Sequence, residues 1–276
     1  MLERIKYVNH INEEIVFGDF PYFVNYNDLR DFAWDVTTRN DRIASFKKGV
    51  VSKSLPVIIK CKKEAEGYDA RNKMFEVFEK DVLACKHGTL YVGDYYLKCF
   101  ITGSKKANYL IAKEFMTLDL TLQTDLPQWV KETTIPIGAR ADETADFLDY
   151  PQIYPHDYKN VQVKGFINNT NFIASNFRLI IYGEIINPTI YIAGHKYNVN
   201  VELNQDDRLI IDSIEKTITL VRDNGTGDRI NCFNLRNRDS YIFEKIPTGE
   251  NLFMSPNDYI RFDITLLDER SEPQWI

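Results

Sequence analysis

The chain has 276 residues, a mass of 32.2 kDa and a formal net charge of −6. An acidic chain of this kind excludes a protein that wraps a phosphate backbone without regard to sequence, because that function needs clustered lysine and arginine. Charged residues make up 27% and hydrophobic residues 44%, which is ordinary for a folded globular protein and excludes disorder.

The N-terminal part is predicted to be β-rich with one helix. Period-2 alternation is clearest at 115–124, and Pro56 indicates that its own strand lies at an edge or begins there. The strand patterns lie at 14–17, 22–24, 52–61, 89–92, 95–101 and 115–124. The segments 89–92 and 95–101 flank a Gly93-Asp94 turn, which predicts that they form a hairpin.

One helix is predicted from about Asp69 to Lys86, because apolar residues recur there at steps of three and four. Gly88 is well placed to end it. The residues expected on its apolar face are Met74, Phe75, Phe78, Val82 and Cys85. We expect this stripe to face the core; a partner-binding face is the alternative.

A domain boundary is predicted near residue 130. Periodicity fades from Val130 to about Lys159, where prolines, aromatic residues and an acidic patch at 142–149 occur together. Because a purely flexible linker needs few aromatics, part of this stretch is expected to pack on a neighbour. The predicted organisation is a domain at 1–130, a linker or extension at 131–160 and a second domain at 161–276.

The second domain is predicted to be all-β, because many short strands follow one another at roughly 8–12-residue spacing without a helix-length pattern. This spacing favours a two-sheet sandwich or jelly roll over a parallel sheet. The strand patterns lie at 177–183, 189–194, 197–201, 208–212, 217–221 and 259–267. The fold class is therefore mainly β, with an α+β N-terminal domain built as a barrel or sandwich.

No motif predicts catalysis, a metal site or a cofactor. The four cysteines lack Cys-x-x-Cys spacing and are expected to be buried free thiols, and the four histidines are scattered. Asp223–Asp228 has oxygen ligands but not EF-hand spacing, so a hairpin turn is expected there, with a cation site as the alternative. Asp206 and Asp207, together with Asp212, could form paired carboxylates for acid–base chemistry, but residues 205–208 are better explained as a polar turn between strands.

The sequence gives no sign of membrane insertion. No apolar run approaches the ~20 residues that cross a bilayer. The first residues lack the apolar stretch of a signal peptide. The protein is therefore expected to be made and folded in a cytoplasm, or to leave it by a route that needs no such signal.

Three stretches carry a resemblance to a known family: 34–46, 79–99, and a C-terminal series that runs from Ile181-Tyr182-Gly183 to Pro273-Gln274-Trp275. Because of the order and spacing of these stretches, essentially the whole chain resembles the distal tail protein (Dit) family of long-tailed phages that infect Gram-positive bacteria. The resemblance implies a β-rich N-terminal domain with one helix and a galectin-like C-terminal sandwich.

The resemblance also implies a structural role in the virion, at the phage tail tip. Six copies would form a ring that extends the tail tube, with the tail tube protein, a tail-associated tip protein and receptor-binding or baseplate proteins as partners. Six copies would carry six times the charge of one chain, which suits a channel for passing DNA without specific nucleic-acid binding.

A ring subunit needs two complementary surfaces, because a head-to-tail interface closes only by rotation. Aromatic side chains suit such contacts, since they bury large areas at modest entropy cost. The candidate interface residues are Trp34, Phe46, Tyr95 and Tyr96. Core burial is the alternative for each of them.

Two other functions compete with the structural one. A carbohydrate-binding module that recognises host cell-wall glycans would use exposed aromatics of the sandwich, although no sugar-binding set stands out. A cell-wall hydrolase would need a nucleophile, an acid–base pair or a zinc site. No such set stands out, so no enzymatic activity, catalytic residue, cofactor or metal is predicted.

Overall fold

The computed structural model describes residues 4–275 except 25, 112–114, 139–162, 224, 226 and 258–259; the side chains of 107–111 are also outside the description. Contacts divide the chain into two compact units. Unit 1 comprises Met1–Lys131 and Glu269–Ile276, and unit 2 comprises Glu132–Asp268. The chain thus returns to unit 1 at its C-terminus, which no sequence pattern indicated.

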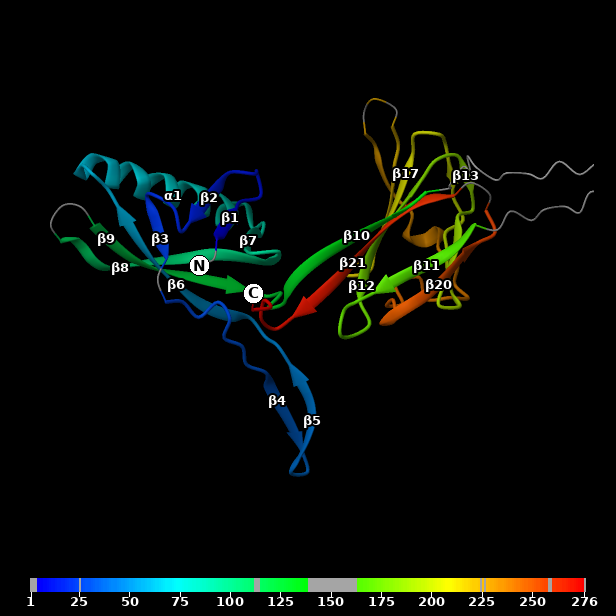
Figure 1. Ribbon diagram of the computed structural model, residues 1–276, viewed down its shortest axis with the longest axis horizontal. Coiled ribbons are helices and arrows are strands. Elements are labelled where there is room, and N and C mark those ends of the chain that lie inside the picture. Colours follow the sequence, from blue (N-terminus) through cyan, green and yellow to red (C-terminus); the bar gives the residue numbers. More distant parts are fainter. Residues whose placement is uncertain are drawn as a thin grey trace, which may run out of the picture. The chain divides into compact units, whose positions relative to one another are not determined.

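Unit 1 is built from antiparallel strands and one long helix (Figure 1). Its elements are β1 (Ile5–Val8), β2 (Glu14–Phe17), β3 (Tyr22–Val24), β4 (Asp35–Arg39), β5 (Arg42–Lys47), β6 (Val51–Lys60), α1 (Glu64–Ala84), β7 (Gly88–Val92), β8 (Tyr95–Ile111), β9 (Phe115–Thr124) and the start of β10 (Trp129–Ile137).

The strands of unit 1 curve into a barrel-like sheet. Their ladders run in the order β2-β1-β7-β8-β9-β6-β3. The long strand β8 pairs with β7 through its first residues and with β9 through the rest, so it joins two sheets. The chain passes from β2 to β3 by a tight turn, in which the Gly18 amide donates to the Tyr22 carbonyl at 2.8 Å. The first and last strands of the series are therefore neighbours.

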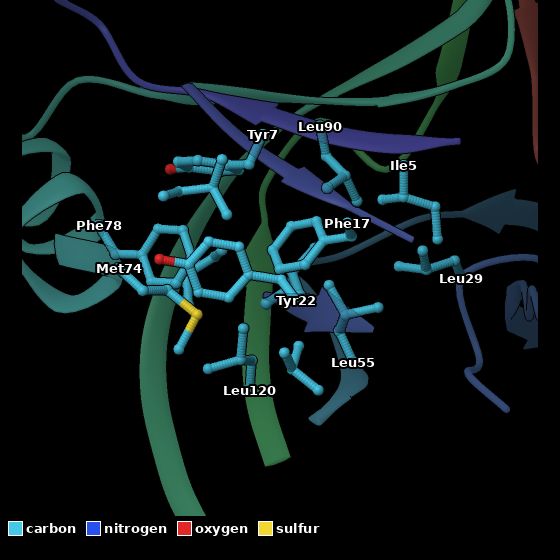
Figure 2. Close-up of a cluster of buried hydrophobic side chains, with 14 of the residues drawn as sticks. Ile5, Tyr7, Phe17, Tyr22, Leu29, Leu55, Met74, Phe78, Leu90 and Leu120 are labelled. Carbon is cyan, nitrogen blue, oxygen red and sulfur yellow. The ribbon is translucent and has the colours of Figure 1, made fainter. Parts of the chain in front are cut away.

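The core of unit 1 lies between this sheet and α1. Figure 2 shows Met74 and Phe78 of the helix pointing into the same cluster as Phe17 and Tyr22. The Tyr7 ring meets that of Phe78 edge-on, with centroids 5.0 Å apart. Because helix and strands bury their apolar sides against each other, neither covers the core alone.

The predicted apolar face of the helix was partly wrong. The buried side chains of α1 are Met74, Val77, Phe78 and Asp81, a regular i, i+3, i+4, i+7 set. The three other predicted residues, Phe75, Val82 and Cys85, are exposed. The helix is rotated away from the predicted face because a charged residue, Asp81, has its hydrogen-bond partners inside the unit.

Gly88 does not end the helix. The helix ends at Ala84, and Cys85 takes the left-handed conformation at φ 50°. Gly88 begins β7, and a Cβ at this position would collide with the Tyr7 hydroxyl and the Asp81 carboxylate. A close approach of three elements, rather than a helix stop, therefore requires glycine here.

Unit 2 contains only β-strands and a 3₁₀ turn among its described residues. Its elements are β11 (Val163–Asn169), β12 (Asn176–Tyr182), β13 (Ile185–Ile186), β14 (Thr189–Ile192), β15 (His195–Asn198), β16 (Glu202–Leu203), β17 (Arg208–Asp212), β18 (Thr217–Val221), β19 (Arg229–Asn231), η1 (Phe233–Leu235), β20 (Gly249–Ser255) and β21 (Arg261–Arg270, ending in unit 1).

These strands form a two-sheet sandwich, as the strand spacing predicted. One sheet has the order β19-β18-β17-β12-β21-β10, in which β10 belongs to unit 2 from Glu132 onward, and the other has the order β11-β20-β14-β15. Aromatic rings from the two sheets meet edge-on: the Phe253 and Phe262 centroids are 5.5 Å apart, and those of Phe177 and Tyr197 are 5.3 Å apart. The mainly-β class with an α+β N-terminal unit is thus confirmed.

The predicted linker contains more strand than the sequence suggested. Strand β10 continues through Ile137, so the first residues of the 131–160 segment are regular structure. The remainder of that segment, with its acidic and aromatic residues, lies outside the described residues.

Candidate interaction surfaces

The most exposed regular structure in unit 1 is the hairpin of β4 and β5, which extends away from the barrel (Figure 1). Asn40 and Asp41 form its two-residue turn, and both have positive φ, as a type I′ hairpin turn requires. A bulge between Thr37 and Thr38 shifts the register, so that Val36 pairs with Phe46 and Thr38 with Ile43. One side of the hairpin therefore carries Val36, Phe46 and Ile43.

Trp34 extends this apolar side toward the hairpin base. Its ring lies 6.4 Å from that of Phe46 in an edge-on arrangement. Trp34 is 45% exposed and Phe46 58%, and Val36 and Ile43 are also exposed. We call these four residues the hairpin face. An isolated two-stranded hairpin is marginally stable in water, so an extended hairpin with an uncovered apolar side is typical of an assembly contact.

The base of the hairpin is fixed by two lysines. The Lys48 ammonium lies 4.5 Å from the Trp34 ring centre and donates to Ser271 Oγ at 2.7 Å. Lys53 is buried and donates to the carbonyls of Asp28, at 3.0 Å, and Asp31. Burial lowers the pKa of both lysines. The base of the hairpin is thus anchored by these contacts, and its strands are exposed.

The predicted interface residues separate into two groups. Trp34 and Phe46 come together on the hairpin face, as described above. Tyr95 is only 3% exposed and belongs to the unit 1 core, so it offers no surface on the single chain. Tyr96, the next residue along the same strand, is half-buried with its ring 6.1 Å from that of Tyr91. Strand alternation explains this difference, since neighbouring residues face opposite sides.

Sequence reasoning missed a second apolar surface, on the outer side of the four-stranded sheet in unit 2. Phe166 of β11 pairs with Leu252 of β20, and Met254 of β20 pairs with Tyr191 of β14. Phe166, Leu252 and Met254 are exposed. In the sequence of β11 and of β20, the residues that face either side of the sheet include apolar ones, which is a signal for an apolar outer face. Only the strand pairing shows that the outward-facing apolar residues of the two strands lie side by side.

The described residues contain no group of His, Cys, Asp or Glu that would hold a metal ion. Asp207 accepts from Arg222 at 2.7 Å and from the Asn204 amide at 2.9 Å, in the polar turn that the sequence predicted. Asp212 pairs with Arg178 at 3.2 Å. The Asp223–Asp228 loop includes residues 224 and 226, which lie outside the described part.

The cysteines are free, and three of them are buried. Cys85 is exposed, and this corrects the expectation that all four are buried. It lies one residue beyond the helix in the left-handed conformation, so it does not continue the buried face of α1. Among the described residues no helix is long and apolar enough to span a membrane.

No protein-family model matches the chain, and no curated protein matches it in sequence. Solved structures do match in fold. The SPP1 Dit protein, described as a paradigm of the hub adsorption apparatus in phages that infect Gram-positive bacteria, aligns at a TM-score of 0.62 and 8% identity, over 98% of this chain and 99% of that one.

Two structures of the phage P2 baseplate in its activated conformation also match. The one with Ca aligns at a TM-score of 0.56 and the one with Sr at 0.58, each at 12% identity over 96% of this chain and 98% of the other. This chain therefore has the fold of SPP1 Dit and of a phage P2 baseplate chain along almost its whole length, as the sequence resemblance predicted.

Proposed function

We propose that this chain is a structural component of a phage tail tip, in which copies of it, six by the resemblance, form a ring at the end of the tail tube. The observation that carries the proposal is the match to SPP1 Dit over 98% of this chain and 99% of that protein. A match of this extent includes both units, so it does not rest on a common sandwich alone.

The hairpin face supports self-association. Trp34, Val36, Ile43 and Phe46 form an apolar surface that the single chain leaves open to water. Covering such a surface with a second copy removes apolar area from water at about 25 cal/mol per Å². A head-to-tail contact of this kind closes into a ring when the rotation between neighbours allows it.

The remaining partners follow from the same role. We propose that unit 1 contacts the tail tube and a tail-associated tip protein. Unit 2 would hold receptor-binding or baseplate proteins, with the exposed Phe166, Leu252 and Met254 as its docking surface. In this role the protein catalyses no reaction and binds no specific nucleic acid, and it works in the virion after synthesis in the host cytoplasm.

Light scattering after size-exclusion chromatography, with negative-stain imaging, tests the ring. The wild-type protein is expected to form a closed particle of six copies. The double variant Trp34→Ser/Phe46→Ser is expected to shift it toward the monomer, because it removes the aromatic part of the hairpin face.

Ile11→Ser is the matched control, since Ile11 is also apolar and exposed in unit 1 but lies in the β1–β2 turn. A wild-type protein that stays monomeric at all concentrations, alone and with the tail tube protein, would contradict the ring. A ring that survives the double variant would contradict the role of the hairpin face.

A further inference from the structure

Unit 2 contains a hollow of about 530 Å³ at the ends of β12, β17 and β21. This volume is within the range of sites that bind small molecules. The side chains that matter lie on the outer side of the sheet, because their neighbours Ile181, Leu209 and Phe262 point into the sandwich core.

Three of these side chains form a row across adjacent strands. Tyr182 pairs with Arg208 of β17 on one side and with Arg261 of β21 on the other. Since neighbouring strands lie about 4.8 Å apart, the two arginines flank the tyrosine ring at a separation of roughly 10 Å. Both arginines are exposed, and within the described residues neither side chain makes an ion pair or hydrogen bond.

Carboxylates complete the hollow. Asp263 accepts a hydrogen bond from the Tyr182 hydroxyl at 2.8 Å, which fixes the ring and leaves the other carboxylate oxygen of Asp263 for a ligand. Asp206, in the turn before β17, is exposed and lines the same hollow. Asp207 is already occupied by Arg222 and the Asn204 amide.

The mixture of groups selects the chemistry of the ligand. Two guanidinium groups would repel a metal ion. The four aspartates that line the hollow, Asp206, Asp207, Asp223 and Asp263, would repel a phosphate polymer. A sugar hydroxyl both donates and accepts, so it can bond an aspartate and an arginine together, and a sugar ring can pack against the tyrosine.

We propose that this hollow binds a neutral saccharide, with Arg208 and Arg261 donating to its hydroxyl oxygens, Asp206 and Asp263 accepting from its hydroxyl groups, and Tyr182 packing against the ring. The site lies wholly within unit 2 and is independent of ring formation. It gives the chain a glycan-binding function in addition to its structural one.

Saturation-transfer NMR on the full-length protein tests this site. The probes are a panel of free neutral sugars (hexoses, N-acetylhexosamines, 6-deoxyhexoses and pentitols) at millimolar concentrations, with inorganic phosphate and calcium chloride as separate titrants followed by calorimetry. At least one sugar is expected to bind. Arg208→Ala and Arg261→Ala are each expected to weaken it about tenfold or more, since each removes a hydrogen bond from a charged donor.

Arg238→Ala is the matched control, because Arg238 is an exposed arginine of unit 2 that does not line the hollow. The three arginine variants are expected to melt at the wild-type temperature, so a loss of binding reports the site and not the fold. Tyr182→Phe keeps the ring and is expected to weaken binding less than either arginine variant.

Three results would overturn the proposal. They are the absence of binding by every sugar in the panel, binding that both arginine variants retain in full, and binding of phosphate or calcium in place of sugar. Each of these can occur while the ring still assembles, and a saccharide can bind to a monomer. Failure of this site is therefore distinguishable from failure of the structural role.

Discussion

Replacing Asp81 by alanine is expected to destabilise unit 1 strongly. Asp81 is 0% exposed, and its carboxylate accepts from the Tyr7 hydroxyl at 2.6 Å and from the His10 backbone amide at 2.9 Å. It also lies 2.6 Å from Nδ1 of His10. This carboxylate therefore connects β1, the turn that follows β1, and the helix.

The expected cost follows from those contacts. Removing one partner of a buried charged network leaves the others unsatisfied, which costs about 3–5 kcal/mol. For a chain of this size, each kcal/mol lowers the melting temperature by about 2–4 °C, so the expected decrease is roughly 6–20 °C.

Tryptophan fluorescence during urea or thermal unfolding measures the loss of stability of unit 1 in the Asp81→Ala variant. All three tryptophans, Trp34, Trp129 and Trp275, belong to unit 1, and Trp129 is buried in its core. The signal therefore follows unit 1 even if the two units unfold separately.

Asp94→Ala is the control, because Asp94 forms an exposed salt bridge with Lys131 at 2.8 Å. An exposed pair contributes about 0–1 kcal/mol, so this variant is expected to unfold close to the wild type. If Asp81→Ala is no less stable than Asp94→Ala, the reasoning about the buried carboxylate is wrong. Tyr7→Phe adds a second check, since its cost should largely vanish when Asp81 is already alanine.

Three further predictions concern the same region. Gly88→Ala is expected to cost about 1–3 kcal/mol in urea unfolding, because its Cβ collides with Tyr7 and Asp81, whereas Gly138→Ala, which has open space, should be neutral. Burial, and then the hydrogen bond to Asp81, raise the pKa of Tyr7. The contribution of Tyr7 to the free energy of unfolding is therefore fully present below its unfolded pKa of ~10 and is lost as pH rises. Above that pH, the free energy of unfolding should fall less steeply for Tyr7→Phe than for the wild type. Cys85 alone should react with a thiol reagent before unfolding, and rapid labelling of a second thiol would contradict its being the exposed one.

Strand positions followed closely from the sequence where one face of a strand is buried. The alternation at 115–124 predicts β9 with its observed bounds, and 208–212 and 217–221 likewise match β17 and β18. The reason is local: a period of two requires only that one side of the strand meets apolar neighbours.

For the helix, the local sequence pattern was not sufficient. Its existence was predictable, but which side faces inward was not, because Asp81 is hydrophilic by type and is buried through partners more than seventy positions away in the sequence. Hydrophobic spacing therefore favoured Phe75 and Val82, which are exposed. A buried charge depends on the donors that surround it, and these are set only by tertiary structure.

The candidate surfaces, too, were predictable from the sequence only in part. Residue type alone pointed to Trp34 and Phe46 as aromatic candidates, and chain-wide resemblance pointed to a phage tail fold. Only the hairpin register places Trp34 and Phe46 on one exposed side, and only the pairing of three strands brings Arg208, Tyr182 and Arg261 into one row. The sequence by itself determined the mainly-β class, the single helix of the described chain and the absence of familiar catalytic motifs. Tertiary structure decided which side chains meet, because contacts between distant segments depend on strand pairing and burial, which no local pattern encodes.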